Sequence, residues 1–347
     1  MEKRLKKLDD KFLELYQQQG LGNYYQYLTP KNIGEEKDKF FQSIKKNEAY
    51  NPRFSYEKIN TEKNIDEWKS LKVMFLEVED EFVKDIYLQK IDELILLNKL
   101  LEKRGQDISK LSIDLFGEPN EDILKLANSL AKLKFEENRR LDVGEAVKKL
   151  QELVDVNGYD LTVEQGKMSS TALFLKSDGK VVLDSDTIFS EGQIRSLFRH
   201  EVLGHYRRYL NGKKSLNIFS IGLKGYEELE EGLAVNEEVK INRVAPLASA
   251  AKKWLAVYHG MRKDFYETFT TLCDYVSEEE AFKLTLRAKR GTSGNKGVFT
   301  KDHSYLTGFL KLQEVDDRDL SFGKFGYDHI SCLKKVRKVW EFHKKHH

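Results

Sequence analysis

Two histidines in the sequence HEVLGH, residues 200–205, are five positions apart, and this interval restricts the local backbone more than any other sequence feature. On a regular α-helix, side chains at positions i and i+5 point about 140° apart, so the two imidazoles could not bind one ion. A π-type bulge adds one residue to a turn and would return both side chains to one face. Gly204 has no Cβ and therefore tolerates such a deformation. If His200 and His205 act together, the sequence predicts a π-type distortion between them.

This spacing has two interpretations. HExxxH is one residue longer than the HExxH of zinc peptidases, in which both histidines are metal ligands and the glutamate is a general base. On that interpretation His200 and His205 bind the metal, and Glu201 takes a proton from water and passes it to the leaving amine. The reaction class is then amide hydrolysis. The alternative is a regular helix whose histidines lie at the surface or make hydrogen bonds in the core.

A zinc site of this type needs a third protein ligand and one open position for water. Glu231 is our candidate, because it belongs to the sequence EEGLA at 230–234 on the next predicted helix. The small residues Gly232 and Ala234 permit a close approach to the first helix. The alternative is that the acidic residues at 227–231 form a solvated face near a helix N-terminus. The metal interpretation predicts one Zn²⁺ per chain, bound by this glutamate and the two histidines.

The pattern along the whole chain predicts a predominantly helical α+β fold of the zincin-like metallopeptidase type. A small sheet or hairpin is expected at 171–183, directly before the metal-binding helix, because apolar runs flank a turn at 177–180. Only four prolines and no Gly/Ser-rich linker occur, so any domain boundary must be a packed one. We expect an N-terminal helical region at 1–110, packed on a catalytic domain at 111–347. Helices are expected at 2–18, 81–104, 121–137, 142–157, 190–211, 226–244, 249–275, 278–289, 301–313 and from about 329.

The composition narrows the choice of partners and compartment. Hydrophobic residues make up 40% and charged residues 33% of the 347 residues, which is enough apolar material for a sizeable core. The net charge of +2 provides no general attraction to nucleic acid or to anionic lipid. The densest apolar run, at 91–101, contains charged residues and predicts a core helix and no membrane span. Cys273 and Cys332 have neither disulfide-framework nor metal-site spacing, so we expect a cytoplasmic protein.

Taken together, these motifs resemble a known family. HEVLGH, followed by Arg208 and then EEGLA, is similar to the MATCAP-type tyrosine carboxypeptidases and their bacterial relatives named for a QEGLA motif. The resemblance extends over most of the chain, through segments that look like further family signatures. These are Asn51-Pro52 with Phe54 and Tyr56, Arg287-Ala-Lys-Arg290-Gly291, Phe299-Thr-Lys301-Asp302 with Tyr305 and Gly308, and Gly323-Lys324 with Tyr327.

The resemblance implies a metallo-exopeptidase that removes a C-terminal aromatic residue, which is the tyrosine of tubulin for the animal enzymes. Because the QEGLA branch has glutamine at the first acidic position, the resemblance favours Glu231 over Glu230 as the metal ligand. Two positions depart from the family pattern. Leu229 replaces a polar residue, and His303 lies inside the Lys-Asp signature; both concern substrate preference more than metal binding.

An exopeptidase must recognise a free terminal carboxylate, which requires cations near the metal. The basic, glycine-containing segment 287–301 supplies them, and the family pattern favours Arg290 and Lys301; the alternative is a flexible basic loop without a ligand. Tyr305, four residues after Lys301, is a candidate donor to the developing oxyanion, with simple packing as its alternative. Arg208 is a third substrate-binding candidate that lies at the cleft or in an ordinary salt bridge. The hairpin edge is a candidate for pairing with an extended substrate.

The leading hypothesis is a zinc-dependent carboxypeptidase that removes Tyr or Phe from the C-terminus of a peptide or protein, with no nucleic-acid or membrane partner. Within the same reaction class, the alternative is a metallo-endopeptidase. A different class is a metal-free binding or regulatory protein that retains the fold without turnover. The intact Glu201 argues against this last alternative.

Overall fold

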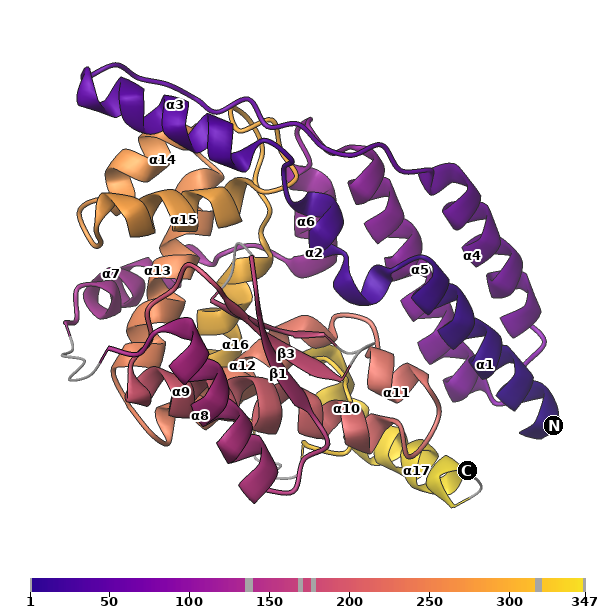
Figure 1. Cartoon of the computed structure of the whole chain (residues 1–347). Helices are drawn as coiled ribbons and strands as arrows, with labels where there is room; N and C mark the ends of the chain where they lie inside the picture. The colour runs from indigo at the N-terminus through magenta and orange to yellow at the C-terminus, as the bar shows by residue number, and fades with distance from the viewer. Residues whose placement is uncertain (1, 135–139, 168–170, 176–178, 316–319, 346–347) are drawn as a thin grey trace.

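The computed structural model describes residues 2–134, 140–167, 171–175, 179–315 and 320–345, and the described chain is mainly helical around one small sheet (Figure 1). This arrangement confirms the predicted α+β class. None of the helices in the described ranges combines the length and the apolar character that a bilayer crossing requires.

The N-terminal helices α1 (Glu2–Gln18), α4 (Thr61–Phe75) and α5 (Glu81–Glu102) lie along one side of the molecule (Figure 1). The apolar side chains of α1 recur at helical spacing, and Phe12 contacts Trp68 and Tyr87 edge-on at ring-centroid distances of 5.4 and 5.3 Å. The same hydrophobic cluster continues through Phe219 and Leu229. One core therefore joins residues on both sides of position 110.

The sheet has the order β1-β3-β2 and consists of β1 (Thr162–Gly166), β2 (Ala172–Leu175) and β3 (Lys180–Asp184). β3 pairs parallel with β1 and antiparallel with β2, which confirms the strand pairing expected for the hairpin; residues 176–178 of its turn lie outside the described residues. Helix α8 (Val143–Val156) packs on the sheet and begins with the capping box of Asp142 and Glu145. β2 is left as an edge strand.

A continuous helical segment follows the sheet. A second capping box, Ser190 with Gln193, starts α9 (Glu191–Leu197), which continues as a π-helix over Phe198–Tyr206 and then as α10 (Arg207–Gly212). The backbone distortion that the histidine spacing requires is therefore present. Helix α12 (Tyr226–Val239) packs between this π-helix and α16 (Ser304–Leu312).

The remaining elements cover this centre, and some differ in length from the prediction. The single helix expected at 249–275 is two helices, because Asp264 caps a new helix through its own capping box with Glu267. The helix expected at 226–244 ends at Val239, and the one expected at 121–137 ends at Ala131, with residues 135–137 of that prediction outside the described residues. These further helices are α2 (Tyr25–Leu28), α3 (Ile33–Lys45), α6 (Ser109–Phe116), α7 (Leu124–Ala131), α11 (Ile218–Ile221), α13 (Ala245–Gly260), α14 (Phe265–Leu272), α15 (Glu278–Lys289) and α17 (Leu333–Lys344).

Candidate metal centre and its cavity

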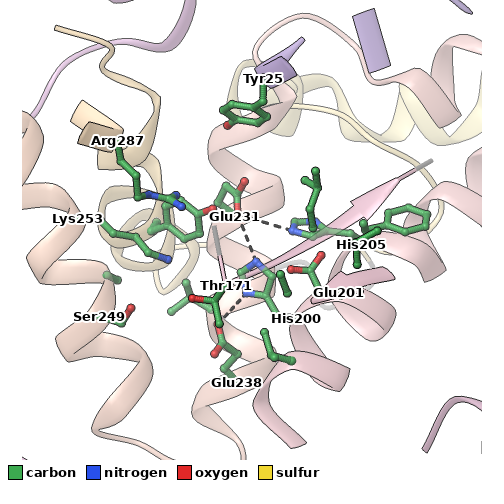
Figure 2. A pocket seen from close by; sticks show the side chains of 18 of the residues that line it. Tyr25, Thr171, His200, Glu201, His205, Glu231, Glu238, Ser249, Lys253 and Arg287 are labelled. Carbon is green, nitrogen blue, oxygen red and sulfur yellow. Dashed lines mark hydrogen bonds and ion pairs between the residues drawn. The ribbon is translucent and has the colours of Figure 1, made fainter. Parts of the chain in front are cut away.

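Three potential ligands meet at the junction of the π-helix and α12 (Figure 2). The Nε2 atoms of His200 and His205 lie 3.5 and 3.7 Å from Oε2 of Glu231. The two imidazole rings are nearly perpendicular, at 83°, with centroids 4.8 Å apart. One ligand atom from each residue lies within 4.8 Å of the others, so the three groups could hold one metal ion.

Two glycine contacts bring α12 into position. A Cβ on Gly204 would lie only 2.9 Å from the Cβ of Ala234. The backbone of the π-helix at Gly204 therefore packs directly against the Ala234 side chain of α12. Gly232 does not face the metal helix, contrary to our expectation. A Cβ at Gly232 would overlap the backbone of Gly308, so this glycine allows α12 to contact α16 on its other side. The EEGLA sequence therefore serves two helix contacts at once.

The oxygens of Glu231 have different surroundings. Oε1 accepts a hydrogen bond from Nζ of Lys301 at 2.5 Å. Oε2 is buried and receives no hydrogen bond from any described residue, although it faces both imidazoles. Burial alone would raise the pKa of Glu231, but Lys301 and the two imidazoles lower it well below its usual range. A buried, ionised oxygen without a donor, next to two imidazole nitrogens, fits a bound cation; this donor set is one that zinc accepts.

Each histidine is oriented by a second carboxylate of α12. Nδ1 of His200 lies 2.7 Å from Oε1 of Glu238, whose other oxygen accepts a hydrogen bond from Ser196 at 2.7 Å. Nδ1 of His205 lies 3.1 Å from Oε1 of Glu230. Such partners fix the ring so that Nε2 points to the metal position. Neither orienting carboxylate was predicted from the sequence. Glu238 nevertheless lies two helical turns after Glu231 and therefore on the same face of α12.

The two orienting carboxylates have different environments. Glu230 forms ion pairs with two buried cations, because it contacts the guanidinium of Arg208 and Nζ of Lys324 lies 2.5 Å away. Burial would raise the pKa of Glu230, but Lys324 and Arg208 hold it well below its usual range. For His200, burial disfavours the imidazolium, yet Glu238 and Glu231 outweigh this effect and raise its pKa to about 10. In the metal-free protein, a proton on Nε2 of His200 would occupy the position that faces Oε2 of Glu231, and a bound cation would replace it.

A cavity of about 1200 Å³ opens over the three ligands. The carboxylate of Glu201 lines it and lies beside the two imidazoles in Figure 2. Edge strand β2 and the preceding Thr171 form part of the wall. The segment around Tyr24 and Tyr25 forms another part, so the N-terminal region contributes directly to the cavity. No sequence motif had indicated this contribution.

The predicted substrate-binding residues fall into two groups. Arg290, Lys301 and Tyr305 line the cavity. Arg208 does not: it is 2% exposed, pairs with Glu230, and donates from Nε to the carbonyl oxygen of Leu320 at 3.1 Å. The expectation that Arg208 binds substrate therefore needs correction. Because Arg208 lies three residues after His205, both side chains reach the same carboxylate, that of Glu230. This ion pair keeps Arg208 buried and out of the cavity.

The two departures from the family pattern also lie away from the cavity. Leu229 is fully buried in the core that α12 shares with the N-terminal helices. His303 is 2% exposed, and its Nε2 lies 2.8 Å from the carbonyl oxygen of Phe116 in α6. Neither side chain lines the cavity. Both residues therefore pack the scaffold, and neither contacts the space above the ligands.

Tyr305 lies between the metal ligands and the basic part of the cavity. Its ring is stacked over His200 at a centroid distance of 6.0 Å, and Nζ of Lys253 lies 3.7 Å from its centroid. Burial, and then the charge of Glu231, raise the pKa of Tyr305 well above its usual range. The hydroxyl therefore stays protonated and able to donate a hydrogen bond.

Comparison with known proteins adds one positive finding. A family model described as microtubule-associated tyrosine carboxypeptidase matches residues 38–338, which is most of the chain. No curated protein matches the sequence. The matched range includes the HEVLGH and EEGLA segments, and the cavity-lining segment at 22–31 precedes it.

Proposed function

Since the chain belongs to the microtubule-associated tyrosine carboxypeptidase family, which implies tyrosine carboxypeptidase activity, we propose that it is a zinc-dependent enzyme removing a C-terminal Tyr or Phe. The substrate is the C-terminus of a peptide or a protein. The observation that carries the proposal is the buried Oε2 of Glu231, which lacks a hydrogen-bond donor in the described structure and faces Nε2 of both His200 and His205.

His200, His205 and Glu231 would hold one Zn²⁺ per chain. When bound, zinc supplies a Lewis acid that polarises the scissile carbonyl and lowers the pKa of a coordinated water toward about 7. Glu238 and Glu230 keep the two imidazoles turned with Nε2 toward this position. Lys301 holds the other oxygen of Glu231 and so prevents that carboxylate from rotating away.

Glu201 is the proposed general base. Its carboxylate lines the cavity next to both imidazoles (Figure 2), where it would accept the proton of the attacking water. It would then pass that proton to the nitrogen of the departing residue. Tyr305 is placed to donate a hydrogen bond to the carbonyl oxygen as negative charge develops on it, because its ring stacks beside His200. Such a donor must already be in place, and burial keeps this hydroxyl protonated.

The substrate backbone has a candidate track along β2. This strand pairs with β3 on one side only, and Thr171 with residues 172–175 lines the cavity. An extended peptide that added to this edge would run past the ligands, and main-chain hydrogen bonds would hold it without regard to its sequence. Selectivity would then depend on side chains deeper in the cavity.

The test uses a set of peptides that differ only in the last residue. Mass spectrometry should show loss of a terminal Tyr or Phe and much slower loss of Leu, Ser or Glu. Amidation of the terminal carboxylate should abolish cleavage, whereas an endopeptidase would still cut the amidated peptide. Metal analysis of the same protein should give one zinc per chain. Internal cleavage, or full activity after metal removal, would contradict the proposal.

A further inference from the structure

Four cations lie at the end of the cavity next to Tyr305, and only two of them form an ion pair with a described carboxylate. The cations are Lys253, Arg287, Arg290 and Lys301, and all four line the cavity. Lys301 is already bonded to Glu231, and Nε of Arg287 donates to Asp302 at 2.6 Å. Within the described ranges no carboxylate makes a hydrogen bond or an ion pair with Lys253 or Arg290, although Asp302 attracts both and Glu238 attracts Lys253.

Arg290 is the more buried of the two. It is 5% exposed, and its Nη2 atom has no hydrogen-bond partner among the described residues. The guanidinium stacks on the ring of Tyr25 at 4.8 Å, which fixes its plane without satisfying its N–H groups. Asp302 is near enough to attract it, but the hydrogen bond of that carboxylate is with Arg287. A buried guanidinium with an unfilled donor is costly unless an anion completes it.

Lys253 reaches the same region from α13, far from the basic segment 287–301. Its Nζ lies 3.7 Å from the centroid of Tyr305, on a ring that in turn stacks over His200. No described residue forms an ion pair with it. Burial and the charge of Arg287 lower its pKa, and the nearby carboxylates of Asp302, Glu238 and Glu231 only partly offset this effect. The neighbouring Lys252 also lines the cavity, but it lies 3.5 Å from Glu280 and so has an acidic partner.

This placement suits one ligand group. A terminal carboxylate must lie about one residue, roughly 4 Å of backbone, beyond the carbonyl that is attacked. The ring of Tyr305 connects the two places, because Nζ of Lys253 lies 3.7 Å from its centroid and His200 stacks on it at a centroid distance of 6.0 Å. A guanidinium offers paired donors to a carboxylate, and an ammonium adds a compact charge beside it.

We propose that Lys253 and Arg290 form the subsite for the terminal carboxylate of the substrate, and that Lys301 is instead a positioning residue for Glu231. This inference rests on the proposed function. It replaces the expectation that Lys301 binds the substrate carboxylate, because its ammonium is already hydrogen-bonded to Glu231. It also adds a residue, Lys253, that no sequence motif had indicated.

Binding of two small probes tests the subsite without turnover. N-acetyltyrosine and N-acetyltyrosinamide differ in the terminal charge, and calorimetry on the zinc-loaded protein should show the acid bound at least tenfold more tightly. Lys253→Met should reduce this preference by about 10- to 100-fold, the range of one charge-assisted hydrogen bond. Lys253→Arg should retain most of it. Lys252→Met, the matched control on the same helix, should retain all of it.

Lys301→Met separates the two roles. With zinc at saturation it should retain the preference for the acid, while a chelator competition should show a zinc affinity reduced by about 10- to 100-fold. Retained preference in Lys253→Met, or lost preference with normal zinc affinity in Lys301→Met, would overturn the inference. So would equal binding of both probes by the unaltered protein.

Failure of the proposed function gives a different result. If no peptide loses its last residue but the acid preference still depends on Lys253, the subsite stands and the exopeptidase proposal falls. If peptides lose a terminal aromatic residue and both probes bind equally, the function stands and this subsite assignment falls.

Discussion

Lys301 donates to Oε1 of Glu231 at 2.5 Å, and this contact divides the carboxylate into one oxygen bound by protein and one left for the metal position. The division favours ligation through Oε2 alone. It also places a positive charge beside a ligand that must stay ionised, and Lys301 itself remains charged because Glu231 raises its pKa despite burial.

Removal of the third ligand should abolish metal binding. Glu231→Ala leaves two imidazoles and also leaves Lys301 without its carboxylate, so we expect zinc content to fall from one per chain to well below a tenth. Mass-spectrometric metal analysis after dialysis measures this. Glu228→Ala, on the same helix and paired at the surface with Lys311, is the control and should keep its zinc. A zinc-loaded Glu231→Ala protein would exclude this ligand.

Glu201→Gln should separate metal binding from chemistry. The amide retains the shape of the side chain but cannot accept the proton, so hydrolysis should fall by about 10²–10⁴-fold. Zinc content should remain that of the unaltered protein, because Glu201 is not one of the three ligands. Rate measurements on zinc-saturated protein make the comparison. Hydrolysis within a factor of three of normal would remove Glu201 from the mechanism.

Substitution of Glu230 should reduce the free energy of unfolding more than substitution of Glu238, the other orienting carboxylate. Glu230→Gln leaves Arg208 and Lys324 buried without a full counter-charge, which should cost about 3–5 kcal/mol of unfolding free energy. Glu238→Gln should cost much less, because its hydrogen-bond partners are Ser196 and the imidazole of His200, which can lose its proton. Both should weaken zinc binding by about 10- to 100-fold. Denaturant unfolding and chelator competition measure the two effects; equal stability losses would contradict the difference.

Zinc binding should become tighter as the pH rises. His200 is protonated below its raised pKa of about 10, so zinc must displace that proton at neutral pH. We expect release of about one proton for each zinc bound near pH 7, and an affinity that falls about tenfold for each unit of decreasing pH. Calorimetry in buffers of different ionisation enthalpy counts the protons. Glu238→Gln should lower this count, and no proton release in the unaltered protein would refute the prediction.

The glycine contacts should be sensitive to one added methyl group. Gly232→Ala would force a Cβ into the backbone of Gly308, so we expect a loss of about 1–3 kcal/mol of unfolding free energy together with weaker zinc binding. Gly34→Ala is the matched control, because nothing lies within 4 Å of its Cβ position on a helix. The control should be neutral or slightly stabilising. Unfolding midpoints that are equal for the two variants would show that α12 and α16 can separate at no cost.

The local parts of the site could be predicted from sequence, and the long-range parts could not. His200 and His205 were identifiable because two histidines at this interval can share one ion only across a π-type distortion, and that distortion is present. Glu231 was predicted from the EEGLA sequence and the family resemblance. Lys253 and Tyr25 were not, because each belongs to an element whose pattern is that of ordinary packing. Their role depends on which surfaces α13 and the N-terminal segment turn toward the cavity.

The misplacement of Arg208 has a related cause. Its spacing from His205 predicted that both side chains lie on one face of the helix, and both do contact one residue. That residue is the buried Glu230, and its carboxylate holds Arg208 out of the cavity. The break at 261–264 was missed because no proline marks it and apolar side chains resume at Phe265, whereas the capping box at Asp264 starts a new helix there. The cytoplasmic location stays a prediction, since no feature of the structure bears on it.

The extra residue in the π-helix is absorbed within that segment, so the chain that follows keeps the direction of a regular helix. Deleting one residue between His200 and His205 would produce the commoner four-residue interval, and a regular α-helix would then carry both histidines on one face. Tyr206, which donates to the carbonyl oxygen of Asp160, and Asn211, which donates to that of Ser321, would keep their directions. The longer motif and the shorter one are thus interchangeable solutions to the same geometric requirement.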